Sequence, residues 1–242
     1  MGKCCLCLEY RTLIDSHIIP NGFFDRILTD EPNLLIDEHS YPKKMRKGVY
    51  DQAILCADCD NLIGKWDDYA QKVLTHDMSG FMPIGPLEKL GGWERAEYDY
   101  PLLKLFFISL VWRASISSHD FYQAVSLGPD LEEKARLMLK SEDPGDPQTF
   151  GVFLARFVEY LGHAFINPLP ETFDGLSYVR FYMAGFVIYL KIDSRPLENL
   201  LKTFLIYPGQ PLRIIKKSIH DAGEDKIFDR LFALPKNQRK RR

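Results

Sequence analysis

Hydrophobic residues recur with helical spacing directly after the second cysteine pair of the chain. In the segment 60–74 (DNLIGKWDDYAQKVL), apolar side chains return every three or four residues, some of them as adjacent pairs. This spacing predicts an amphipathic helix with one face packed on a core. Asp60 falls in its first turn, where a carboxylate complements the helix dipole, and Gly64 leaves a gap beside it. We expect Asp67 and Asp68 to face solvent.

Longer apolar runs place further helices and strands in the rest of the chain. Residues 102–117 are apolar nearly all round, which predicts a buried helix, with Arg113 held there in a buried salt bridge. Aromatic and β-branched residues predict strands over 150–160, 178–183 and 186–192, the last two joined at Ala184 and Gly185. Helices are expected over 130–139, where Asp130 and Glu133 form a capping box, 197–205 and 212–232. The expected fold class is α+β.

The polar stretches between these segments are expected to form short or irregular elements. Arg11 to Ile19 has apolar ends around a polar centre and predicts a β-hairpin. Residues 30–48 are polar and contain two prolines, so we expect a long loop there. Residues 78–92 hold four glycines and two prolines and predict a linker or crossover.

Composition and charge place the chain in an ordinary globular class. Of the 242 residues, 46% are hydrophobic and 26% are charged, a balance that excludes a wholly disordered chain. No apolar run reaches the length of a bilayer span, and the start MGKCCLCLEY is unlike a secretory signal, so a cytoplasmic protein without membrane contact is expected. The net charge is −2, but residues 236–242 form a basic tail, either a phosphate-contacting arm or a solubility tail.

The cysteines carry a sharper chemical signal. All five lie in the first quarter of the chain, and four of them form two C-x2-C pairs, Cys4 with Cys7 and Cys56 with Cys59. This spacing lets two thiolates from each turn reach one tetrahedral Zn²⁺. A closed site of four cysteines has no open coordination position, so the predicted zinc is structural. Cys5 offers a C-x-C alternative to Cys4, and ordinary buried thiols are the other interpretation.

The order of these motifs resembles a known nuclease family. A C-x2-C pair, a Ser-His-Ile-Ile-Pro segment at 16–20 and a second C-x2-C pair that opens a helix are similar to zinc-stapled HNH (ββα-metal, treble-clef) endonucleases, and in particular to bacterial HNH-like proteins with Ser-His-Ile-Ile-Pro. The resemblance covers residues 4–75. It implies a zinc-binding nuclease domain over 1–76, followed here by a linker over 77–100 and an α+β accessory domain over 101–235.

The resemblance also implies a role for individual residues. His17 matches the general base that takes a proton from the attacking water, and Asp60 matches the ligand of a catalytic Mg²⁺ or Mn²⁺ ion. Ser16 departs from the family pattern, because Asp or His commonly ligates the metal at that position. With a hydroxyl there, Asp15, Asn61 or water are the alternative ligands.

The expected activity is hydrolysis of phosphodiester bonds in DNA, with RNA as a possible substrate and antiviral defence in prokaryotes as the setting. A basic cluster in the loop is a candidate nucleic-acid contact, or it balances neighbouring acidic residues; its members are Lys43, Lys44, Arg46 and Lys47. The alternative function is a non-catalytic zinc module that binds nucleic acid or a partner protein. The C-terminal domain is expected to bind a protein partner or a second copy of the chain.

Overall fold

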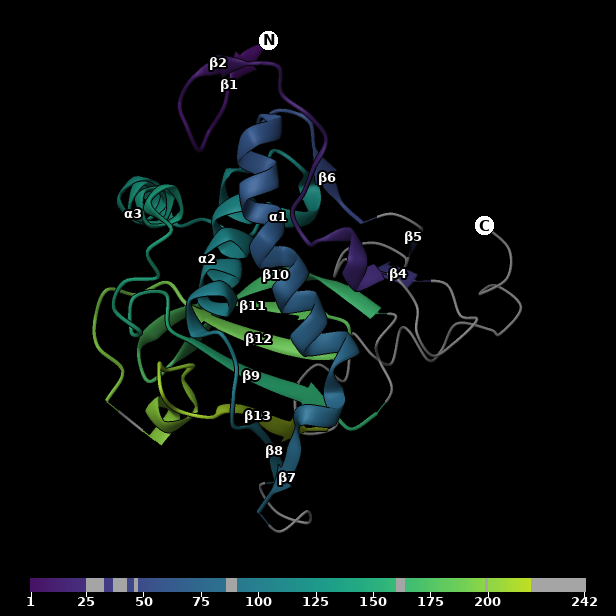
Figure 1. Ribbon diagram of the computed structural model, residues 1–242, viewed down its shortest axis with the longest axis vertical. Coiled ribbons are helices and arrows are strands. Elements are labelled where there is room, and N and C mark those ends of the chain that lie inside the picture. Colours follow the sequence, from purple (N-terminus) through teal and green to yellow (C-terminus); the bar gives the residue numbers. More distant parts are fainter. Residues whose placement is uncertain are drawn as a thin grey trace.

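The computed structural model in Figure 1 is a mixed α+β structure built on one large sheet. It describes residues 1–24, 33–36, 43–45, 48–85, 91–159, 164–198 and 200–218. Within these ranges the chain forms three α-helices, one nine-stranded sheet and two two-stranded sheets. The α+β class expected from the sequence is therefore confirmed.

The nine strands of the large sheet come from distant parts of the chain. In spatial order they are β5 (Lys43–Met45), β4 (Asn33–Ile36), β10 (Ala164–Phe173), β11 (Leu176–Met183), β12 (Phe186–Lys191), β9 (Val152–Phe157), β13 (Leu212–Lys217), β8 (Gly92–Arg95) and β7 (Met82–Ile84). The pairs β4–β10 and β9–β13 are parallel, and the other neighbours are antiparallel.

Alternating side chains of the central strands enter two different cores. In β11, Val179 and Phe181 join the larger hydrophobic core, whereas Tyr178 and Tyr182 join a smaller aromatic cluster on the opposite face. This separation follows from the two-residue period of a strand. Helices α1 (Ala57–Gln71) and α2 (Tyr100–Ile116) cover the face of the larger core (Figure 1). Helix α3 (Gly128–Ser141) packs against α2.

Helix α2 is the buried helix expected from its apolar sequence. Asp99 caps it by accepting a hydrogen bond of 2.9 Å from the Leu102 N–H, and Pro101 suits its first turn. Thirteen of its residues are buried. The expected helix after Cys59 is also confirmed as α1, and β11 and β12 form the expected hairpin, with Ala184 and Gly185 both at positive φ.

The predicted hairpin over Arg11 to Ile19 is wrong. Its residues pair with other parts of the chain: β2 (Tyr10–Arg11) with β1 (Gly2–Lys3), and β3 (Ser16–His17) with β6 (Tyr50–Asp51). Leu13 forms a bridge with Cys56. Each strand has only two residues, and its partner lies outside the predicted hairpin. The local sequence pattern therefore does not reveal the pairing.

Other predictions from polar or helical patterns also fail. The expected loop over 30–48 contains β4 and β5, the expected linker contains β7 and β8, and the start of the expected helix 212–232 is strand β13. Helix α3 begins at Gly128 with Leu127 at its N-cap, so the predicted capping box does not form. Over 197–205, the structure has a 3₁₀ helix at Leu200–Phe204. Further short turns lie at Asn21–Phe24, Lys72–His76, Met78–Gly80 and Asp120–Tyr122.

The larger core runs across the expected domain boundary at residue 76. Ile63 and Trp66 of α1 share it with Phe106 and Phe107 of α2 and with Phe165 of β10. The division into three regions stays a prediction, and the basic tail over 236–242 lies outside the described residues. Over the described ranges, none of the helices combines the length and the apolar character needed to cross a membrane.

Candidate functional site

Four cysteines from two distant turns meet at one end of the molecule. Cys4 and Cys7 lie in the turn between β1 and β2, where the Cys4 N–H donates to the Glu9 carbonyl. Cys56 is the N-cap of α1, and Cys59 lies in its first turn. Their sulfur atoms are all within 4.8 Å of one another. The two C-x2-C pairs therefore form a single cluster.

The cluster fits a structural zinc ion. Four sulfurs at the Zn–S distance of about 2.3 Å define a tetrahedron with edges of about 3.8 Å, and the sulfur separations in the structure, none above 4.8 Å, are compatible with it. Burial would raise the pKa of the Cys4 thiol, but backbone N–H groups, among them that of Cys56 at 3.4 Å, direct hydrogen bonds to its sulfur and lower the pKa to about 7. Cys5 is not part of this four-sulfur cluster, and burial raises the pKa of its thiol.

Neighbouring thiols also affect Cys59. Burial and hydrogen bonding to the other cysteines raise the pKa of its thiol. Four thiolates in one small space repel one another, and a divalent cation offsets that repulsion. The donor set consists of sulfur alone, which suits zinc and leaves no role for Mg²⁺, a cation that prefers oxygen ligands.

His17 lies on β3, close to the cysteine cluster in sequence but in a different sheet. It is opposite Tyr50 of β6, and the two rings meet edge to face with their centroids 6.0 Å apart. The next residue, Ile18, donates its N–H to the Val49 carbonyl. The half-buried side chain of His17 is thus positioned by backbone pairing on both sides.

Arg113 connects this strand to α1. Its Nη1 donates to the His17 carbonyl at 2.6 Å, and its two terminal nitrogens bind the Asp67 carboxylate at 2.9 and 2.7 Å. Arg113 is 1% exposed, and the Asp67 side chain is 13% exposed. The predicted buried salt bridge of Arg113 is therefore present. The expectation that Asp67 faces solvent is wrong, because α2 covers this side of α1; Asp68 is exposed as expected.

Asp60 lies on the same face of α1 as Asp67. The two are seven residues apart, which is about two helical turns. Gly64, four residues after Asp60, lies between them on the same face. Burial raises the pKa of Asp67, the Arg113 guanidinium opposes this shift, and the negative charge of Asp60 adds to it. A Cβ atom on Gly64 would meet nothing within 4 Å. The surface of α1 is therefore open at Gly64, one helical turn after the half-buried Asp60.

The other candidate ligands are placed less favourably for a shared metal ion. Ser16 is completely buried, and among the described residues its hydroxyl oxygen has no hydrogen-bond partner. Asn61 and Asp15 are exposed. Lys43 and Lys44 lie on β5, at an edge of the large sheet, and Arg46 and Lys47 lie outside the described residues.

Asp51 is a residue of this region that sequence reasoning missed. Its buried carboxylate accepts hydrogen bonds from the Ala53 N–H and from both Ser117 and Ser118, at the end of α2. Burial alone would raise its pKa, but these hydrogen bonds lower it. No local pattern marks Asp51, because its main partners lie 66 and 67 residues further along the chain.

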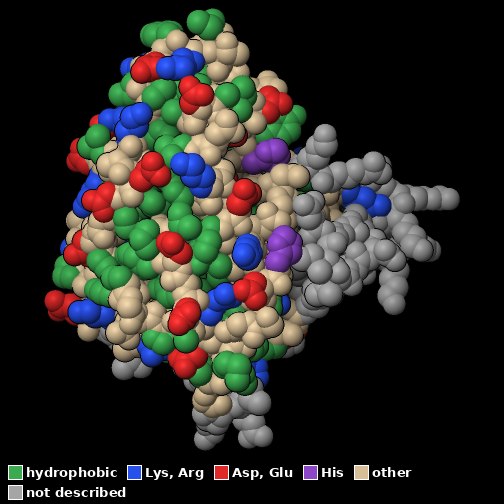
Figure 2. Space-filling model, in the orientation of Figure 1, with side chains coloured by type: hydrophobic (Ala, Val, Ile, Leu, Met, Phe, Trp, Pro, Cys, Tyr) green, Lys and Arg blue, Asp and Glu red, His purple; other side chains and the backbone are tan. Residues whose placement is uncertain are grey.

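Charges of both signs cover the face that carries α1 and α2. Figure 2 shows Lys and Arg side chains interspersed with Asp and Glu among the residues coloured on this face. The cysteine cluster, β3 and the start of α1 thus lie in a surface without a single dominant sign of charge. Comparison with known proteins found no match: no family model, curated protein or solved structure is similar to this chain.

Proposed function

We propose that this protein is a metal-dependent endonuclease of the HNH type that hydrolyses phosphodiester bonds in DNA. The observation that carries the proposal is the connection of β3 to α1 through Arg113, which binds both the His17 carbonyl and the Asp67 carboxylate. Asp60 lies two helical turns before Asp67, on the same face. His17 and Asp60 thus belong to two elements that Arg113 joins.

The cysteine cluster would fix the position of the start of α1. One zinc ion bound by Cys4, Cys7, Cys56 and Cys59 would attach the first turn of α1, which contains Asp60, to the turn between β1 and β2. A treble-clef organisation of residues 1–76 belongs to the proposal. The zinc has a structural role, because four thiolates leave no position for water or substrate.

His17 is the proposed general base. In this role, the neutral imidazole takes a proton from the attacking water. Asp60 is the proposed carboxylate ligand of Mg²⁺ or Mn²⁺, and among the described residues no side chain crowds the surface of α1 at Gly64, one turn further along. When bound, the divalent ion supplies positive charge that stabilises the phosphate in the transition state.

A non-catalytic zinc module is the second candidate. Ser16 occupies the position of a usual metal ligand, yet its side chain is buried. The mixed charge of the face in Figure 2 also lacks the continuous basic surface of a strong nucleic-acid binder. In this second proposal the cysteine cluster holds a surface for nucleic acid, a partner protein or another copy of the chain.

Cleavage of supercoiled plasmid DNA separates these two functions. We expect the zinc-loaded wild type to nick plasmid in Mg²⁺ or Mn²⁺, and His17→Ala and Asp60→Ala to lose at least about a hundredfold in rate. His76→Ala and Asp68→Ala are the matched controls, because both residues are exposed and lie on or next to α1. Equal cleavage by all variants would reject the assigned site, and a folded wild type that never cuts would favour the binding module.

A further inference from the structure

A cavity of about 250 Å³ lies on the side of the protein near α3, away from the cysteine cluster in sequence. Its wall includes Lys134 of α3, Asp146 and Phe150 from the segment after α3, and Lys191 and Asp193 at the end of β12. This volume is below the usual range for drug-sized ligands, roughly 300–1,000 Å³, and suits a small molecule. None of these residues belongs to the site proposed above.

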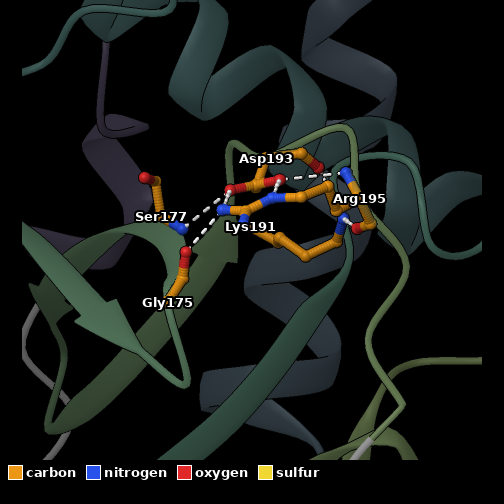
Figure 3. Close-up of polar contacts among 5 residues, drawn as sticks. All are labelled: Gly175, Ser177, Lys191, Asp193 and Arg195. Atoms are coloured by element: carbon orange, nitrogen blue, oxygen red, sulfur yellow. Dashed lines mark hydrogen bonds and ion pairs between the residues drawn. The ribbon is translucent and has the colours of Figure 1, made fainter.

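Two buried lysines lie at or behind the wall of the cavity, and within the described ranges their partners are neutral oxygens. Lys191 is 1% exposed, and its ammonium group donates to the carbonyls of Asp193 and Arg195, each at 2.5 Å (Figure 3). Lys104 of α2 is completely buried and donates to the carbonyls of Pro147 and Phe150. An ammonium group has three N–H donors, and the contacts among the described residues use two donors of each lysine.

The nearby carboxylates do not neutralise these two cations. Asp193 lies closest to Lys191, but its carboxylate binds the Arg195 guanidinium at 2.6 Å and accepts from the Ser177 N–H. Figure 3 shows Arg195 against Asp193, with Arg195 also donating to the Gly175 carbonyl. Asp146 accepts from the Gln148 N–H and acts on both lysines only at longer range.

The charge balance around the cavity is consequently positive. The wall itself contains two cations, Lys134 and Lys191, and two carboxylates, Asp146 and Asp193. Because Asp193 is paired with Arg195, which lies outside the wall, one positive charge remains in excess. Burial lowers the pKa of Lys104 to about 7, and it also lowers the pKa of Lys191. Within the described residues, Lys191 is thus a buried cation without a carboxylate in contact. Such burial is costly, and a bound anion would reduce this cost.

We propose that this cavity binds a small organic anion, with its carboxylate or phosphate group at Lys191 and Lys134 and its apolar part against Leu131, Phe150 and Pro196. The mixed lining matches such a ligand, because apolar residues share the wall with the cationic groups. Lys134 is exposed and already donates to the Thr149 hydroxyl at 3.4 Å, so it lies at the rim of the cavity. The site is independent of the proposed nuclease activity.

Isothermal titration calorimetry of the full chain tests the proposal. A chloride salt keeps the ionic strength the same in all titrations. The probes are inorganic phosphate, phenyl phosphate and benzoate. We expect saturable binding, tighter for the phenyl compounds than for inorganic phosphate because they also fill the apolar side. The comparison of phenyl phosphate with benzoate then identifies which anionic group the cavity prefers.

Two exposed wall residues and one exposed control position provide variants that test the charges of the cavity without disturbing its buried lysine. Lys134→Ala should weaken binding about threefold, whereas Asp146→Asn should strengthen it about threefold, because each changes one charge at the wall. Asn at position 146 keeps an acceptor for the Gln148 N–H. Lys140→Ala, on the same helix as Lys134 but outside the cavity, should leave the dissociation constant unchanged.

A further variant removes a buried cation. Lys191→Met should weaken binding at least about tenfold, and if this variant does not fold, the opposite shifts of Lys134→Ala and Asp146→Asn decide the question. If all three probes bind no better than chloride, or if the two wall variants behave like Lys140→Ala, the lysines serve only to hold the neighbouring loops and the proposal is wrong.

Discussion

The guanidinium of Arg113 donates a 2.6 Å hydrogen bond to the main-chain carbonyl of His17. The same group forms a two-pronged ion pair with Asp67, so one buried side chain of α2 joins strand β3 to helix α1. The planar fork of arginine makes both contacts at once, which a lysine ammonium does not. The position of His17 relative to α1 therefore depends on a residue 96 positions further along the chain.

The coupling between Arg113 and Asp67 is measurable in a double-mutant cycle. Arg113→Met should lower the free energy of unfolding by about 3–5 kcal/mol, because it leaves a buried carboxylate without its partner. Asp67→Asn should also destabilise, and the double variant should lose less than the two single losses added together. Urea unfolding measures all four proteins. Asp68→Asn is the exposed control, with a change below about 0.5 kcal/mol, and additive losses would contradict the ion pair.

Zinc is expected to stabilise the end of the molecule that carries the cysteines. Elemental analysis should find one zinc per chain, and Cys56→Ser should lose it together with more than about 3 kcal/mol of stability. Cys5→Ser is the matched control, because Cys5 lies outside the four-sulfur cluster, and it should keep the metal. A folded wild type without zinc, or a Cys56→Ser protein of unchanged metal content, would contradict this prediction.

Burial of Lys104 should make stability depend on pH above neutrality. Its pKa is about 7 in the folded protein and 10.5 as the reference value, so between these values the unfolded chain binds the additional proton. The free energy of unfolding therefore rises with pH in this window. From about pH 7 to about pH 10, wild type should gain up to about 4 kcal/mol relative to Lys104→Met.

The comparison with Lys104→Met cancels the titration of other groups, and unfolding is followed by fluorescence in buffers without phosphate or carboxylates. Asp146 opposes the downward shift of the Lys104 pKa, and Lys191 adds to it. Lys140→Met, an exposed substitution of the same kind, should track wild type at every pH. A difference between wild type and Lys104→Met that stays constant from neutral to alkaline pH would show that Lys104 keeps its ordinary pKa.

The sequence predicts those elements that are recognisable from local patterns. Helix α1 has clear helical periodicity, α2 is apolar all round, and the hairpin of β11 and β12 has aromatic and β-branched strands. The cysteine spacing also places four sulfurs in one cluster. In each case, short-range order in the sequence is enough to indicate the element.

Elements that depend on distant partners were not predicted. Strands β4 and β8 have four residues each and pair with the distant strands β10 and β13. Strands β5 and β7, of three residues each, then pair with β4 and β8 at the two edges of the sheet. Arg113 was recognised as a buried cation, but its partner Asp67 was not, because α2 determines which face of α1 is covered. Asp51 was missed for the same reason, since its serine partners are on another element.

Paramagnetic broadening by Mn²⁺ tests most directly whether His17 and Asp60 share one divalent ion. In the zinc-loaded, isotope-labelled protein, we predict that Mn²⁺ broadens the amide signals of Asp60 and Gly64 and the ring signals of His17 most strongly. Mg²⁺ should displace the Mn²⁺ and restore the signals. The broadening should be absent in Asp60→Ala and as strong in Asp68→Ala as in wild type. Broadening centred elsewhere, or undiminished in Asp60→Ala, would contradict the proposed active site.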